Sequence, residues 1–273
     1  MFDNVVVGVR SECAGRDAMA LAKQLVSPEG ELILVHVHVV PSAPDAVSAR
    51  NAEKCRYAVA RLTALARASL ITAHVSCVEA RSIRRGLHEF SSRRRADLLV
   101  VSASHRDELG RDFISDNVRQ VLEDAPCPVA IAPSGYGARV DAMTTIGVAY
   151  DGSAESKQAL RLARSLAAER DADVSAFEAV GSPVYVHNSW DVREQFEAPV
   201  EEARQRLAAL RDLDAQARFG DQVDELSRYE QSVDLLVIGS HKYRRIDRLL
   251  QSSTAQRLAD NPSAPLLVLS AAA

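Results

Sequence analysis

The sequence contains one internal repeat, and its copies are separated by an almost constant number of residues. Three segments recur in the same order: residues 97–101 at 234–238, residues 125–131 at 262–268, and residues 5–9 at 144–148. The first two matches have an offset of 137 residues and the third an offset of 139. Chance similarity between apolar segments would not keep this register along a whole chain, so the sequence predicts one small domain present twice.

The link between the copies falls near residues 135–138, a short segment that contains two glycines. We therefore expect an N-terminal domain over residues 1–136 and a C-terminal domain over residues 141–273. A chain of 273 residues is long enough for two domains that each bury an adequate core. Aromatic residues make up only 5% of the chain, so these cores must consist of Val, Leu, Ile and Ala.

Each copy alternates short apolar runs with amphipathic segments. The expected strands cover residues 4–9, 32–35, 71–79, 97–102 and 128–132, then 145–150, 173–179, 214–219, 234–239 and 265–269. The expected helices cover residues 16–26, 52–69, 83–95 and 113–124, then 154–169, 194–211, 222–231 and 253–260. Parallel strands need helical crossovers, so this alternation predicts an α/β protein with two tandem, doubly wound, Rossmann-like domains of five parallel strands.

Charge and hydropathy exclude several classes of partner. Residues 1–140 carry a net charge of +2 and the remainder carries −6, which is too little positive charge for a nucleic-acid-binding surface. No apolar run reaches the roughly 18 residues of a membrane span, and the N-terminus lacks the pattern of a signal peptide. We therefore expect a cytoplasmic protein with no nucleic-acid or membrane partner.

The chain has four cysteines, all in the first half: Cys13, Cys55, Cys77 and Cys127. None is in a C-x-x-C pair, so we expect four free thiols and neither a disulfide nor a zinc site. His36 and His38 lie on one face of an expected strand at a spacing that could hold a metal, but no third ligand is placed to join them. A hydrogen-bonded histidine pair is the expected outcome, and no metal site is predicted.

Ligands of doubly wound sheets bind beyond the carboxyl ends of the strands, which directs attention to two segments of the second half. Asp151, Gly152 and Ser153 follow the first strand there, where a tight turn, a helix cap and a carboxylate come together. Gly239, Ser240 and Lys242 follow the fourth strand, and Ser252 and Ser253 precede the next helix. A helix N-terminus with free N–H groups suits a phosphate, but simple helix capping explains the same residue types.

The Asp-Gly-Ser turn, the fourth strand Asp234–Ser240 and the Pro-containing fifth strand resemble the universal stress protein family, twice over nearly the whole chain. ATP-binding members carry a signature of Gly, two residues, Gly, nine residues, then Gly and Ser or Thr. The resemblance places Gly239, Lys242, Ser252 and Ser253 at these positions in the second half, so two of the three glycines are missing. It also implies a nucleotide contact from Asp151 and a backbone contact to adenine near Ala179 or Val180.

The first half departs further from the family pattern. Its turn reads Arg10-Ser11-Glu12, and the signature positions hold Ser102, His105, Ser115 and Asp116. A carboxylate at Asp116 would satisfy the N–H groups of the helix and repel a phosphate. We expect a nucleotide-free first half, and at most one ATP or AMP site, in the second.

The resemblance implies a regulatory stress-response protein that acts by self-association and partner binding, without strong catalysis. In the family, fifth strands of two domains commonly pair, so residues 128–132 and 265–269 are the expected pairing edges of an intramolecular pseudo-dimer. A homodimer of such chains and a protein partner are also expected. An ATP- or AMP-binding switch is the first alternative and a slow ATP hydrolase the second.

Two other features carry weaker expectations. The arginines between Arg81 and Arg95 alternate with Leu87 and Phe90 at helical spacing, which predicts a solvated helix face, with an acidic partner surface as the alternative. Trp190, with Tyr185 and His187, lies in a loop that could be a lid or a partner contact.

Overall fold

The computed structural model describes residues 1–40, 48–103, 116–138, 142–181, 192–239 and 254–269. The chain divides into two compact units. The first unit comprises Met1–Asp141 together with Ala259–Ala273, and the second comprises Ala142–Leu258. The C-terminal strand is therefore part of the first unit.

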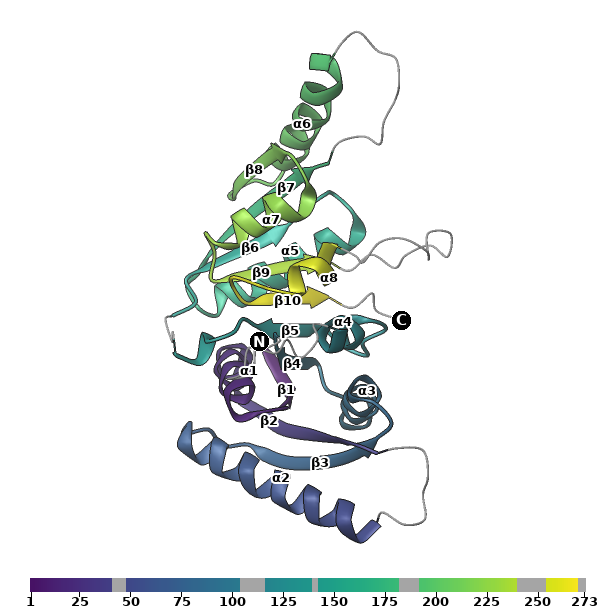
Figure 1. The fold of residues 1–273 in the computed structure, drawn as a ribbon. Coiled ribbons are helices and arrows are strands. Elements are labelled where there is room, and N and C mark those ends of the chain that lie inside the picture. Colours follow the sequence, from purple (N-terminus) through teal and green to yellow (C-terminus); the bar gives the residue numbers. More distant parts are fainter. Residues whose placement is uncertain (41–47, 104–115, 139–141, 182–191, 240–253, 270–273) are drawn as a thin grey trace. The chain divides into compact units, whose positions relative to one another are not determined.

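The first unit is a doubly wound sheet with helices on both faces (Figure 1). Its elements are β1 (Phe2–Gly8), α1 (Glu12–Leu25), β2 (Val26–Val39), α2 (Ser48–Ala68), β3 (His74–Ala80), α3 (Ile83–Arg94), β4 (Leu98–Ser102), α4 (Asp116–Leu122), β5 (Val129–Ala132), a 3-10 turn at Tyr136–Ala138 and β10 (Leu266–Leu269). The strand order is β3-β2-β1-β4-β5-β10. All neighbours are parallel except β5 and β10, which are antiparallel.

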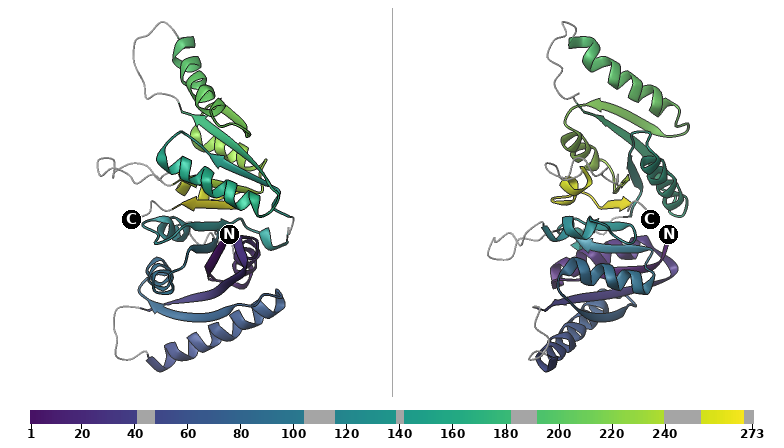
Figure 2. Two further views of the ribbon diagram at one scale, coloured as in Figure 1. Left: turned by 180° about the vertical axis from the view of Figure 1, so that it is seen from behind. Right: turned by 90° about the vertical axis from the view of Figure 1, so that its right-hand side faces the viewer.

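The second unit repeats this arrangement (Figure 2). Its elements are β6 (Thr145–Ala149), α5 (Ala154–Ala168), β7 (Asp173–Val180), α6 (Val192–Ala208), β8 (Asp214–Phe219), α7 (Gln222–Glu230), β9 (Leu235–Gly239) and α8 (Thr254–Ala259). Its parallel strands have the order β9-β6-β7-β8. The order reverses beside β1 in one unit and beside β6 in the other, so the predicted doubly wound α/β fold is confirmed.

The cores are aliphatic, as the composition predicts. Val5, Val6 and Val7 of the central strand β1 are completely buried, which explains an apolar run without alternation. Helix α1 buries Ala18, Leu21, Ala22 and Leu25 against the sheet, which is the predicted amphipathic face. Burial of such side chains is the main favourable contribution to folding.

The repeated aspartates fasten the start of the central strand in each unit. Asp97 accepts hydrogen bonds from the backbone N–H groups of Asp3 (2.8 Å) and Asn4 (3.0 Å). Asp234 accepts from the backbone N–H groups of Thr144 and Thr145, both at 2.8 Å, and from both threonine hydroxyls. The first residue of the repeated Asp-Leu-Leu-Val segment therefore has a structural role.

The predicted pairing of the fifth strands is confirmed. Leu266, Leu267 and Val268 of β10 pair with Ile131, Ala130 and Val129 of β5 in antiparallel register. Beside this ladder, the guanidinium of Arg119 on α4 makes a bidentate ion pair with Asp260, with Nε donating to Oδ1 at 2.6 Å. Strand edges that pair in this way are closed to uncontrolled association.

The prediction of four free thiols is wrong for two of the cysteines. Cys55 on α2 and Cys77 on β3 form a disulfide with a Cα–Cα distance of 5.5 Å, while Cys13 and Cys127 are free. The residues are 22 positions apart in sequence, and only the crossover from α2 to the edge strand brings them together. Burial raises the pKa of the Cys127 thiol to about 12, so this cysteine is protonated at neutral pH.

Candidate functional site

A cavity of about 150 Å³ lies at the carboxyl ends of β6, β7 and β9 in the second unit. Strands and the turn after β6 supply Ala149, Tyr150, Asp151, Phe177, Glu178, Ala179, Ile238 and Gly239; helices supply Ser156, Gln222, Leu226, Thr254 and Ala255. The reversal of strand order opens a crevice at this place in doubly wound sheets. Three of the residues predicted to bind nucleotide, Asp151, Ala179 and Gly239, share its lining.

The turn after β6 is organised by its own side chains. Oδ1 of Asp151 accepts a hydrogen bond from the backbone N–H of Ser153 at 3.0 Å. Ser153 is the N-cap of α5, and its Oγ accepts from the backbone N–H of Ser156 at 3.1 Å. The capping roles considered in the sequence are therefore filled, and the exposed Asp151 carboxylate still reaches the cavity.

Two glycines in this region are required by their surroundings. Gly152 has a φ of +81°, which side chains rarely adopt, and a Cβ on it would lie 2.5 Å from Cδ of Arg206. A Cβ on Gly239 would lie 2.7 Å from the backbone carbonyl carbon of Glu155, in the first turn of α5. Gly239 therefore allows close packing of β9 on α5, whether or not a ligand binds.

Glu178, which lines the cavity, forms an ion pair with a partly exposed arginine. Glu178, on β7, is only 7% exposed, and the Arg206 guanidinium on α6 donates to both of its carboxylate oxygens at 2.7 and 3.2 Å. The hydrogen bond to Glu178 raises the pKa of Arg206, and the charges of Glu178, Glu202 and Asp151 raise it further. Arg206 thus lies over Gly152, between two carboxylates that line the cavity.

The family model for universal stress proteins matches this chain twice, over residues 1–133 and 143–270. The chain belongs to the universal stress protein family. Its fold is similar to that of a universal stress protein from Archaeoglobus fulgidus DSM 4304, at 14% identity and a TM-score of 0.67, with coverage of 98% of this chain and 96% of that one. A crystal structure described as a universal stress protein from Pseudomonas aeruginosa UCBPP-PA14 is similar at 17% identity and a TM-score of 0.67, covering 98% and 93%.

Some of the nucleotide-binding positions predicted for this universal stress protein lie outside the described residues, namely Ser240, Lys242, Ser252 and Ser253. Val180 ends β7, and its carbonyl accepts a hydrogen bond from the Gly220 N–H at 3.1 Å. Ala179, Gly152 and Ser153 are half-buried. Nucleotide binding by these residues stays a prediction.

In the first half of this universal stress protein, Ser11 caps α1 by accepting from the Ala14 N–H, and Arg10 is exposed. Asp116 begins α4, whereas His105 and Ser115 lie outside the described residues. A cavity of about 670 Å³ lies beside this turn, lined by Val9, Arg10, His36, His38 and one side of α2. His36 and His38 are hydrogen-bonded as expected, to the Val9 carbonyl (3.0 Å) and to Asn51 Oδ1 (3.2 Å).

Other sequence features of this universal stress protein have structural explanations. The arginine-rich segment forms α3, where Arg84 pairs with Glu123 and Asp124, and Arg85 pairs with Glu89.

Trp190, Tyr185 and His187 lie outside the described residues. Among the described residues, no group of three or more His, Cys, Asp or Glu side chains could hold a metal ion. The helices in the described part of the chain include none long and apolar enough to cross a membrane.

Sequence reasoning missed the Glu178–Arg206 pair. Glu178 is a single charged residue inside a buried strand, and such residues are almost always paired, so its position was a usable signal. Its partner lies 28 residues away on α6, and that contact depends on how the helix crosses β7. The fold, rather than any local pattern, identifies Arg206.

Proposed function

We propose that this stress-response protein acts by binding partners and associating with itself, without strong catalysis. The supporting observation is the small volume of the crevice in which a ligand of this fold would bind. Its volume of about 150 Å³ is below the roughly 300–1,000 Å³ that is usual for small-molecule sites, and Glu178, one of its lining residues, is already bound to Arg206. The first half has a larger cavity of about 670 Å³, but its turn reads Arg10-Ser11-Glu12, so the aspartate expected to contact a nucleotide is missing there.

The proposal is tested by releasing small molecules from freshly purified protein and identifying them by mass spectrometry. We expect no bound nucleotide and no change in melting temperature with ATP and magnesium. Light scattering over a range of concentrations measures self-association in the same samples. Co-purified ATP or AMP, or a thermal shift that saturates with nucleotide, would contradict the proposal.

A nucleotide-responsive switch is the second candidate, because Asp151, Ala179 and Gly239 do line one cavity. In this candidate the nucleotide displaces Arg206 from Glu178, and the exchange of partners changes the position of α6. Arg206→Ala would then increase nucleotide affinity by removing the side chain with which the nucleotide competes for this position beside Glu178. Asp151→Ala would weaken binding, and Arg10→Ala would not.

Arg204→Ala is the matched control for this experiment. Arg204 is also on α6, its side chain is 64% exposed, and it pairs only with Glu201 among the described residues. Isothermal calorimetry with ATP and AMP compares the four variants. Equal affinity of the Arg206 and Arg204 variants would reject the switch, and equal effects of the Asp151 and Arg10 substitutions would reject the assignment of the site to the second half.

A further inference from the structure

The Cys55–Cys77 disulfide joins a helix to an edge strand. Cys55 lies on α2 and Cys77 lies on β3, the outermost strand of the first unit. Both residues are half-buried, so a small thiol can reach the bond. Accessible disulfides are the ones that exchange with thiols in solution.

Helix α2 is anchored unevenly along its length. Leu62, Leu65 and Ala66 in its C-terminal part are only 5–6% exposed and pack in the core. Across residues 51–61, Asn51 is the single buried residue, and the others are half-buried or exposed. Apolar packing therefore fixes the last turns of the helix, whereas its first turns depend on other contacts.

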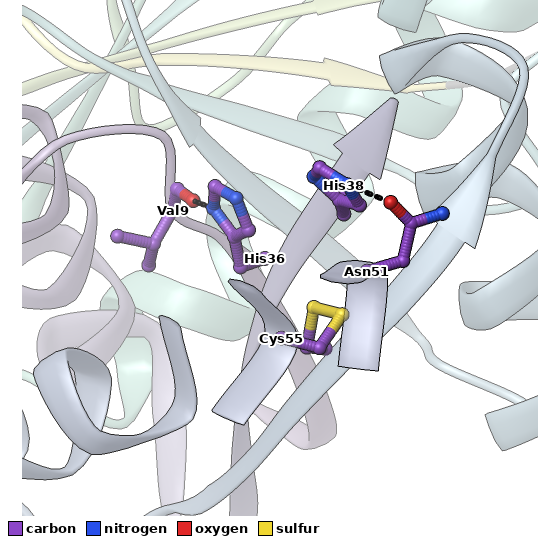
Figure 3. Close-up of a disulfide and its surroundings, with 6 residues drawn as sticks. Val9, His36, His38, Asn51 and Cys55 are labelled. Carbon is purple, nitrogen blue, oxygen red and sulfur yellow. Dashed lines mark hydrogen bonds between the residues drawn. A yellow bond between two sulfur atoms is a disulfide. The ribbon is translucent and has the colours of Figure 1, made fainter. Parts of the chain in front are cut away.

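Within the described part of α2, a hydrogen bond and the disulfide link these first turns to the sheet, one helical turn apart. Figure 3 shows Asn51 and Cys55 on the same helix, with Asn51 Oδ1 directed at the His38 ring at 3.2 Å. The disulfide is the covalent one of the two. Once it is broken, the link between the described first turns and strand β2 is the exchangeable Asn51–His38 hydrogen bond.

The same turns of α2 form a wall of the 670 Å³ cavity of the first unit. Glu53, Lys54, Tyr57 and Arg61 face it from the helix, and His36 and His38 face it from β2. The Val9 carbonyl can only accept, so Nδ1 of His36 donates to it. The position of α2 thus decides how open the histidine side of this cavity is.

We propose that Cys55–Cys77 is a reversible thiol switch that sets the order of the first turns of α2 and the opening of this cavity. A low-molecular-weight thiol is the reductant. Its thiolate attacks one sulfur, the S–S bond breaks, and a mixed disulfide and a protein thiolate form. A second thiol displaces the protein sulfur, so two small thiols become one small disulfide and the protein gains two electrons and two protons as two Cys thiols.

The first test counts thiols in the full chain. Protein purified in air is unfolded and alkylated, with and without prior reduction by dithiothreitol, and its mass is measured. We expect two alkylated cysteines, Cys13 and Cys127, before reduction and four after it, with peptides containing Cys55 and Cys77 linked only in the first sample. Four alkylated cysteines in the unreduced protein would overturn the proposal.

The second test measures amide hydrogen exchange in oxidised and reduced wild-type protein. Reduction is expected to accelerate exchange in residues 51–61 several-fold more than in residues 62–68. Cys55→Ser and Cys77→Ser should show the fast pattern with or without dithiothreitol, and Cys13→Ser, a change at an exposed free cysteine, should behave as wild type. Removing the reductant and adding oxidised glutathione should restore slow exchange in wild-type protein.

If residues 51–61 exchange equally fast in both redox states, the proposal is overturned, even if the first test has shown that the disulfide forms. An equal acceleration of residues 51–61 and residues 62–68 would also overturn it, because that outcome describes a disulfide that stabilises the whole unit and has no particular effect on the first turns of α2. The wild-type comparison needs no substitution and stays decisive if a serine variant fails to fold.

Discussion

Asp97 and Asp234 illustrate how single residues preserve the repeat. Each stands just before the fourth strand of its unit and accepts hydrogen bonds from the start of the central strand. Burial alone would raise the pKa of Asp234, but the donors on Thr144 and Thr145 outweigh it, so the pKa lies below its ordinary value. A depressed carboxyl pKa stabilises the fold at pH values above the unfolded-state pKa.

Asp234→Asn should therefore lower stability by about 1 kcal/mol at neutral pH, because neutral hydrogen bonds replace charge-assisted ones. The wild-type advantage should be constant above about pH 5 and shrink below about pH 4, where the wild-type carboxyl becomes protonated. Urea unfolding at several pH values measures this, with Asp171→Asn at an exposed turn as the control. An advantage that persists at pH 2 would contradict the assigned interaction.

Gly239 is a residue for which the family pattern and the packing make different predictions. If the glycine is needed for packing on α5, Gly239→Ala should destabilise the protein by about 1–3 kcal/mol without any nucleotide present. Gly181→Ala is the control, since its nearest neighbour lies 3.6 Å from the added Cβ, and its effect should be within about 0.5 kcal/mol. Equal stability of both variants would show that α5 yields to the added methyl group.

At the scale of elements, apolar periodicity was sufficient to predict the strands and helices of the described residues. Predicted strand 214–219 and helix 222–231 match β8 and α7 to within one residue. The second strand was underestimated, because β2 extends from Val26 to Val39 through Pro28 and Gly30, which normally mark a turn. The ladder with β1 pairs Phe2 with Val26 and resumes at Asn4 and Glu31, so Pro28 and Gly30 lie in an irregular part of the strand that a sequence pattern does not reveal.

The candidate site was only partly predictable for the same reason. Asp151 follows a strand and Gly239 ends one, so both could be found by inspection, whereas the Glu178–Arg206 pair and the Cys55–Cys77 bond each join a helix to a strand. Such contacts depend on helix crossing geometry. The absence of C-x-x-C pairs gave the wrong expectation, because that test compares only cysteines that are close in sequence.

The disulfide should contribute measurably to stability. By the chain-entropy estimate, cross-linking residues 22 positions apart stabilises a fold by about 3 kcal/mol. Dithiothreitol should therefore lower the urea midpoint of the wild-type protein, and Cys55→Ser should show the lower midpoint in both conditions. A midpoint that is unaffected by dithiothreitol in wild-type protein would mean that the bond is absent in solution.

At the scale of the whole molecule, duplication gives the chain both strands of an antiparallel pair. A separate domain needs a second copy to cover its fifth strand, whereas here Val268 and Leu266 pair with Val129 and Ile131 of the same chain. The Arg119–Asp260 ion pair supports the same connection from outside the sheet. The edge that would otherwise cause dimerisation is therefore satisfied within one chain.

Methyl NMR on deuterated protein tests directly whether β5 and β10 pair within one chain. With Ile, Leu and Val methyl groups labelled in every chain, we expect cross-strand NOEs between Leu266 and Ile131 and between Val268 and Val129, which are direct partners in the ladder. A mixture of chains labelled only on Ile with chains labelled only on Leu should lack the Leu266–Ile131 NOE. Its presence in the mixture would show that β5 and β10 pair between molecules, and its absence from both samples would show that they do not pair.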